Sequence, residues 1–223
     1  KRKKILTLLD NTWGTPLYLK PLELGFDMSF SSATKYFSGH SDAMGGSLAV
    51  NKEVFKKIMF FYKLSGYRMS ADEAYLIIRG LRTLDTRLNQ HYQNTKTVIN
   101  FLKKQKKIKE ILYPHKPGSK NYKLWKKYYT GATGLLSIVI KSKNKSSVIK
   151  FVNSLELFGI GYSWGGFESL AILQELKLSK DEYSQGRRFF KCEKNEHIVR
   201  LHIGLEDPKD LITDLKQSLR YIK

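Results

Sequence analysis

The sequence predicts an α/β fold that gives way to an α+β region. Short apolar runs at residues 4–9 and 27–31 are typical of strands, and residues 17–24 between them favour a helix that follows a Thr-Pro pair and ends at Gly25. A strand, a crossover and a second strand form a βαβ unit, whose strands run parallel. From residue 108 onward the pattern changes to the α+β type, which indicates a second domain.

The middle of the chain predicts three helices. Asn51 is expected to cap the first, over residues 51–64, and Ser70 opens a capping box for the second, over 70–79. In the first helix, a stripe at helical spacing is expected to be buried: Phe55, Ile58, Met59 and Tyr62. The third helix, over 85–104, is long enough to link two domains. The predicted division is therefore 1–84, a linking helix over 85–107, and 108–223.

The second domain is predicted to contain four strands and two helices. The strands are expected at residues 108–113, 135–140, about 189–192, and 197–203. Asn144 is expected to cap one helix, and Asp207-Pro208 to begin the final one, because a capping acid followed by proline suits a first turn.

Composition is that of a soluble globular protein. No apolar run approaches membrane-spanning length, and no secretory signal pattern follows the basic residues 1–4. Cys192 is the only cysteine, so an intrachain disulfide is impossible and a cytoplasmic location is expected. The thiol of Cys192 is expected to pack within a strand.

The net charge of +20, from 40 basic and 20 acidic residues, has two interpretations. One is nucleic-acid binding. The other is compositional drift, which we favour because lysine greatly outnumbers arginine and the lysines are scattered. Nucleic-acid recognition tends to use arginine for base edges and bidentate phosphate contacts. We therefore expect neither a nucleic-acid nor a membrane partner.

The candidate site is centred on Lys35. A lysine that forms a Schiff base must be reachable and able to lose its proton near neutral pH. Ser32 and Thr34 precede it and lie two residues apart, so in an extended backbone both hydroxyls point to one side and could bind a phosphate. Asp10 ends the first predicted strand, so it and Lys35 lie beyond the carboxyl ends of parallel strands, where open α/β sheets bind ligands. A buried carboxylate and an amine at one crevice suit pyridoxal phosphate.

The chain resembles the Cys/Met-metabolism pyridoxal phosphate enzymes along its whole length. The segments that carry the resemblance occur in the family's order: Asp10-Asn11-Thr12-Trp13, Ser32-Ala33-Thr34-Lys35-Tyr36, Gly39-His40-Ser41-Asp42, Arg79-Gly80-Leu81-Arg82-Thr83-Leu84, Tyr162-Ser163-Trp164-Gly165-Gly166-Phe167-Glu168-Ser169-Leu170 and Arg200-Leu201-His202-Ile203-Gly204-Leu205-Glu206. Members of this family are longer, and the chain resembles their C-terminal part. The resemblance implies fold type I, with part of the large cofactor-binding domain and the C-terminal small domain.

The resemblance also implies the roles of individual residues. Lys35 would hold the cofactor covalently and act as acid and base, while Asp10 would bind the pyridine nitrogen. Thr12 would lie near the ring, with a turn-stabilising hydroxyl as the alternative, and Ser32 and Thr34 would bind the phosphate. Three further residues would form the substrate pocket, with the last gripping the α-carboxylate: Ser163, Trp164 and Arg200.

With tryptophan at position 164, the chain resembles the branch of the family that cleaves cystathionine by β-elimination. That reaction gives homocysteine, pyruvate and ammonia. A γ-lyase, a γ-synthase or a cysteine-conjugate β-lyase is the main alternative within the family. The resemblance implies a homo-oligomer, a dimer of dimers, and leaves open a complementary N-terminal fragment as partner. Two other classes stay open: a non-catalytic remnant of such an enzyme, and a basic nucleic-acid-binding module. The five histidines show no metal-ligand spacing, so no metal site is expected.

Overall fold

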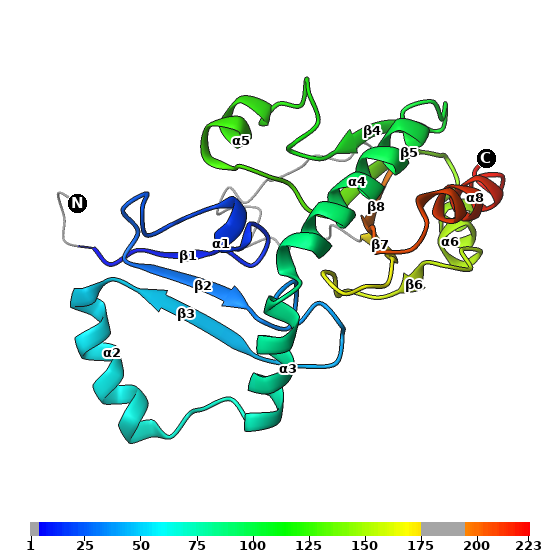
Figure 1. The fold of residues 1–223 in the computed structure, drawn as a ribbon. Coiled ribbons are helices and arrows are strands. Elements are labelled where there is room, and N and C mark those ends of the chain that lie inside the picture. Colours follow the sequence, from blue (N-terminus) through cyan, green and yellow to red (C-terminus); the bar gives the residue numbers. More distant parts are fainter. Residues whose placement is uncertain (1–4, 175–194) are drawn as a thin grey trace. The chain divides into compact units, whose positions relative to one another are not determined.

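The computed structural model of the chain describes residues 5–174 and 195–223. It divides into two compact units, and Figure 1 traces both along the sequence. Unit 1 consists of Lys1–Tyr92, Pro114–Thr133 and Gly165–Phe167. Unit 2 consists of Gln93–Tyr113, Gly134–Trp164 and Glu168–Lys223. The predicted strand at 189–192 and Cys192 lie outside the described residues.

Unit 1 contains a three-stranded sheet in the order β1-β2-β3. β1 (Leu8–Asp10) pairs in parallel with β2 (Met28–Ser32), and β2 pairs antiparallel with β3 (Gly46–Val50). The predicted parallel βαβ unit is therefore confirmed, with the first strand later than expected.

The crossover helix α1 (Thr15–Tyr18) is shorter than the predicted 17–24. It ends at Leu19, whose backbone is extended at φ −142° and ψ 132°. Pro21 follows two residues later, where it cannot donate a backbone hydrogen bond. The residues up to Gly25 form turns instead of further helix.

The first two helices of the middle segment begin at the predicted caps, and the third begins one residue before the predicted start at Asp85. They are α2 (Lys52–Ser65), α3 (Ala71–Leu81) and α4 (Leu84–Leu102). The Asn51 side chain accepts a hydrogen bond from Val54 N at 2.9 Å, and Ser70 Oγ accepts one from Glu73 N at 3.2 Å. α4 contributes to unit 1 up to Tyr92 and to unit 2 from Gln93. Unit 1 also contains the short helix α5 (Tyr122–Tyr128).

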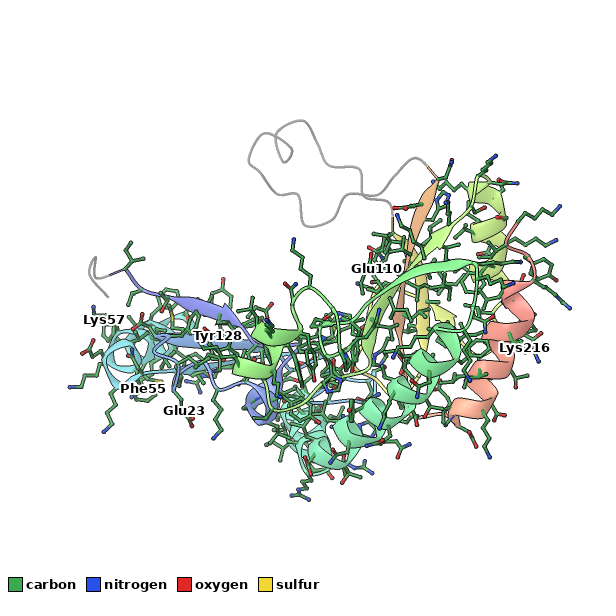
Figure 2. The ribbon with its side chains drawn as sticks, turned by 90° about the horizontal axis from the view of Figure 1, so that it is seen from above. Glu23, Phe55, Lys57, Glu110, Tyr128 and Lys216 are labelled. Carbon is green, nitrogen blue, oxygen red and sulfur yellow. The ribbon has the colours of Figure 1, made fainter. Side chains whose placement is uncertain are left out.

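The predicted burial of the α2 stripe is wrong for the described chain. Phe55 is 52% exposed and Tyr62 is 39% exposed, and only Val54 of this helix is buried. Figure 2 shows Phe55 among the side chains that α2 presents. Helical spacing identifies an apolar face, but burial also requires a second layer, which the described residues do not place there.

Unit 2 is built around a five-stranded sheet in the order β4-β5-β8-β7-β6. The strands are β4 (Ile108–Leu112), β5 (Leu135–Lys141), β6 (Gly159–Ile160), β7 (Leu170–Gln174) and β8 (Glu196–His202). Neighbours run antiparallel except β6 and β7, which are parallel. The core holds side chains with no exposed surface, among them Ile138, Val139, Ile140, Val199 and Leu201.

Two helices accompany this sheet, α6 (Lys145–Asn153) and α8 (Pro208–Leu219), and both begin at the predicted caps. β7 was not predicted, because a short apolar run such as Leu-Ala-Ile-Leu does not distinguish a strand from a helix. It lies between β8 and β6, inside the sheet.

Asp214 connects α8 to the segment that follows α6. Its buried carboxylate accepts hydrogen bonds from Glu156 N at 2.9 Å and Leu157 N at 2.8 Å. We expect Asp214→Ala to lower the free energy of unfolding by about 1–3 kcal/mol, because two backbone amides lose the buried carboxylate that accepts their hydrogen bonds. Urea unfolding followed by circular dichroism measures this loss. Lys216→Ala, at an exposed position of the same helix (Figure 2), is the control, and an equal loss in both variants would contradict the assignment.

Candidate functional site

The parallel pairing of β1 and β2 brings Asp10 and the segment before Lys35 to one edge of the sheet. Asp10 ends β1 opposite Phe30, and β2 ends two residues later at Ser32. Adjacent parallel strands present their carboxyl ends at the same edge. The structure therefore places Asp10 and the turn that carries Lys35 at that edge, as expected, while the roles of both residues remain predictions.

Thr12 connects the ends of the two strands through its hydroxyl. Thr12 Oγ1 donates a hydrogen bond to Asp10 Oδ1 at 2.5 Å and accepts one from Ser32 N at 2.8 Å. Thr12 N donates to the same Asp10 oxygen at 2.9 Å. Thr12 is buried, whereas Asp10 is exposed and not buried as the sequence had suggested. Asp10 is thus a solvent-facing carboxylate whose orientation is fixed by a buried neighbour.

The extended geometry expected for Ser32 and Thr34 is wrong, because β2 ends at Ser32 and residues 33–38 form a turn. Thr34 Oγ1 accepts a hydrogen bond from Gly45 N at 3.0 Å and lies 3.4 Å from Gly45 O. The Thr34 hydroxyl therefore fastens the turn to the segment before β3. Lys35 is the third residue of this turn, and its backbone N–H donates a hydrogen bond to Ser32 O at 3.2 Å.

Gly165 packs against the backbone of the Lys35 turn within unit 1. Its φ is +89°, and a Cβ there would lie 2.9 Å from Tyr36 N and 3.2 Å from Lys35 Cα. Only a residue without a side chain allows this approach. Ser163 and Trp164 precede Gly165 in the chain and belong to unit 2.

Arg200 lies near the middle of β8, paired with Ser137 of β5 and Ile172 of β7. Its Nη2 donates a hydrogen bond to Tyr162 O, and its guanidinium carbon lies 6.0 Å from the centre of the Tyr162 ring. Partial burial lowers the pKa of Arg200, and the Tyr162 hydroxyl opposes that shift. Unit 2 therefore places Arg200 beside the residue that precedes Ser163.

The predicted site residues thus fall into two groups. Unit 1 brings together Asp10, Thr12, Ser32, Thr34 and Lys35, and unit 2 holds Ser163, Trp164 and Arg200. The donor set of unit 1 fits pyridoxal phosphate, since it supplies an oriented carboxylate for a pyridine nitrogen and a lysine at one sheet edge.

Sequence reasoning missed Arg87 as part of the candidate site. Arg87 of α4 is buried and binds the carbonyl groups of Tyr36 and Phe37, which directly follow Lys35. A signal was available, because Arg87 lies on the buried face of α4 with Leu84, Leu88 and His91 at helical spacing. A charge within such a stripe requires partners.

Within residues 5–174 and 195–223, no group of three or more His, Cys, Asp or Glu side chains could hold a metal ion. In the same residues, no helix has the length and apolar character needed to cross a membrane.

Comparison with known proteins connects this geometry to one family. A sequence profile of the Cys/Met metabolism PLP-dependent enzymes matches residues 1–220. The chain is 39% identical over 220 residues to L-alanine/L-glutamate racemase of Wolbachia pipientis wMel, covering 98% of this chain and 53% of that protein. It is 38% identical over 211 residues to cystathionine beta-lyase MetC of Escherichia coli (strain K12), covering 94% and 52%.

Among solved structures, the chain superposes on cystathionine gamma synthase from Xanthomonas oryzae pv. oryzae in complex with cystathionine. The TM-score is 0.86 at 28% identity, over 99% of this chain and 56% of that chain. The chain therefore spans about half the length of the curated relatives and of this solved structure.

The Thr12 hydroxyl gives a direct test of the strand-end geometry. We expect Thr12→Val to lower the free energy of unfolding by about 1–3 kcal/mol, because Ser32 N and Asp10 Oδ1 each lose a partner. Urea unfolding followed by tryptophan fluorescence measures the change. Thr12→Ser keeps the hydroxyl and is the control, and a loss in Thr12→Ser as large as in Thr12→Val would contradict the role of the hydroxyl.

Proposed function

The chain belongs to the Cys/Met metabolism PLP-dependent enzymes, and on this premise we propose that it carries the site of a carbon–sulfur lyase that acts on cystathionine. The reaction consumes cystathionine and water and yields homocysteine, pyruvate and ammonia. The observation that carries the proposal is the placement of Asp10, held by Thr12, at the same sheet edge as the Lys35 turn.

The cofactor site is proposed in unit 1. Asp10 would bind the pyridine nitrogen, Ser32 and Thr34 the phosphate, and Lys35 the aldehyde end. When bound, pyridoxal phosphate supplies a ring that accepts electrons from bonds broken at the α-carbon of an amino acid. Thr12 keeps the Asp10 carboxylate in one orientation by holding Oδ1, so its negative charge remains directed at one position.

The substrate contacts are proposed in unit 2. The Arg200 guanidinium would bind the α-carboxylate, because its planar group can donate two parallel hydrogen bonds to the two carboxylate oxygens. Ser163 and Trp164 would form the wall of the pocket. The Lys35 amine would take the proton from the α-carbon and return a proton to the sulfur that leaves, so one base serves both transfers.

A second candidate reaction is racemisation of an amino acid, which the 39% identity to the Wolbachia racemase favours. It uses the same removal of the α-proton but breaks no carbon–sulfur bond. Pyruvate release from cystathionine and the appearance of D-alanine or D-glutamate from the L-amino acids distinguish the two. Light scattering of the same preparation measures its molar mass and so reports whether the chain forms a homo-oligomer.

We expect the purified chain with added pyridoxal phosphate to develop a visible absorption band that Lys35→Ala lacks. The amine is the group that joins the cofactor, so its removal abolishes the band and pyruvate release together. Lys63→Ala, on α2, is the control and should behave like the parent. Identical spectra from the parent and Lys35→Ala would overturn the assignment of Lys35.

We expect Arg200→Met to lower kcat/KM for cystathionine by about tenfold to a hundredfold, because hydrogen bonds to a charged group are lost. Arg220→Met removes an exposed guanidinium from the same unit and is the control. Steady-state pyruvate release measures both. Unchanged kcat/KM in Arg200→Met would remove this residue from the substrate site.

A further inference from the structure

Arg87 is a buried cation whose partners among residues 5–174 and 195–223 are all uncharged oxygens. It is 6% exposed, and its guanidinium makes four hydrogen bonds within unit 1. Nε donates to Thr83 Oγ1 at 3.0 Å, Nη1 donates to Tyr36 O at 2.9 Å, and Nη2 donates to Gly80 O at 2.7 Å and Phe37 O at 3.4 Å. Burial lowers the pKa of Arg87. Burying a charged guanidinium costs free energy, and here hydrogen bonds to backbone carbonyls and one hydroxyl offset that cost.

The carbonyl groups of Tyr36 and Phe37 belong to the two residues that follow Lys35. The third carbonyl, that of Gly80, lies at the end of α3. Arg87 therefore joins the end of one helix to the Lys35 turn, and Figure 1 shows the segment after β2 running beside the α3–α4 junction. An arginine fork can bind several carbonyls in one plane, whereas a lysine is a point charge.

Two glycines allow this close packing. A Cβ on Gly80 would lie 2.2 Å from Ser38 O, and a Cβ on Gly39 would lie 1.9 Å from Arg87 Nη1. Gly39 also has a φ of +67°, a backbone conformation that residues with a side chain rarely adopt. The turn is thus held between α3 and the guanidinium with no room for a side chain at either contact.

The turn has its own hydrogen bonds, which report on its order. Ser38 N donates to Ala33 O at 2.9 Å, and Gly39 N donates to Lys35 O at 2.9 Å. These two amides close the turn around Lys35, directly beside the carbonyls that Arg87 binds. Their protection from exchange with solvent is a measure of how firmly Lys35 is held.

We propose that Arg87 is a positioning residue for Lys35. It fixes the backbone of residues 36–39, and so the point from which the Lys35 side chain leaves the turn, without touching the reacting groups itself. The consequence for cofactor binding rests on the proposed function, but the hold on the turn does not. Without the Arg87 guanidinium, α4 would keep its fold, while the backbone of residues 36–39 would lose two hydrogen bonds and become more mobile.

Amide hydrogen exchange by NMR tests the hold on the turn directly, in the full chain without cofactor. In Arg87→Met, we expect the Ser38 and Gly39 amides to exchange at least about tenfold faster than in Leu88→Ala, since hydrogen bonds to a charged group are lost. Leu88 is the next residue of α4 and is fully buried, so Leu88→Ala destabilises the same helix without removing the fork. Arg87→Lys should restore only part of the protection.

Binding of pyridoxal phosphate then tests the consequence for Lys35. We expect the concentration needed for half of the visible band to rise about tenfold in Arg87→Met and to stay near the parent value in Leu88→Ala. If Arg87→Met does not fold, Thr83→Val removes only the acceptor of Nε and takes its place, with a smaller effect in the same direction.

The two measurements separate the proposals. A parent chain that forms no band counts against the proposed function, and the exchange rates still decide the role of Arg87. Exchange of Ser38 and Gly39 in Arg87→Met that is no faster than in Leu88→Ala would overturn the positioning role. A band that forms equally well in Arg87→Met and the parent would overturn its consequence for Lys35.

Discussion

The parallel pairing of β1 with β2 is the constraint on which the candidate site depends. Because side chains alternate and parallel strands end at one edge, the register that sets Asp10 opposite Phe30 also fixes how far Lys35 lies beyond that edge. Thr12 reinforces this arrangement by bonding Asp10 and Ser32 N with one hydroxyl. The candidate site of unit 1 thus lies at the ends of two strands, and the backbone pairing of these strands sets the relative positions of its residues.

Much of this could be predicted from the sequence, because the deciding signals are local. The caps at Asn51, Ser70, Asn144 and Asp207 all accept the expected backbone hydrogen bonds. The parallel βαβ unit follows from the order of two strands and a short crossover. Such features depend on neighbours in the chain, so sequence spacing is enough to identify them.

The errors have the opposite character, since they concern what a residue packs against. The α2 stripe is apolar, but spacing does not state what covers it. The Thr34 hydroxyl was expected to lie beside that of Ser32, yet the strand ends at Ser32 and Thr34 binds Gly45 instead. Arg87 was missed for the same reason, because the two partners that tie it to the Lys35 turn, the carbonyls of Tyr36 and Phe37, lie some fifty residues earlier in the chain.

The two arginines of the candidate site differ in burial and in how many of their donors are occupied, and we propose different roles for them on that ground. Arg87 is almost fully buried, and its guanidinium donates hydrogen bonds to four oxygens. These bonds offset the free-energy cost of burying its charge. Arg200 is more exposed, and among the described residues its guanidinium donates to one carbonyl, that of Tyr162, beside an aromatic ring. An arginine with donors left over favours a carboxylate ligand. The difference in burial and in occupied donors therefore favours the positioning role that we propose for Arg87 and the carboxylate-binding role that we propose for Arg200.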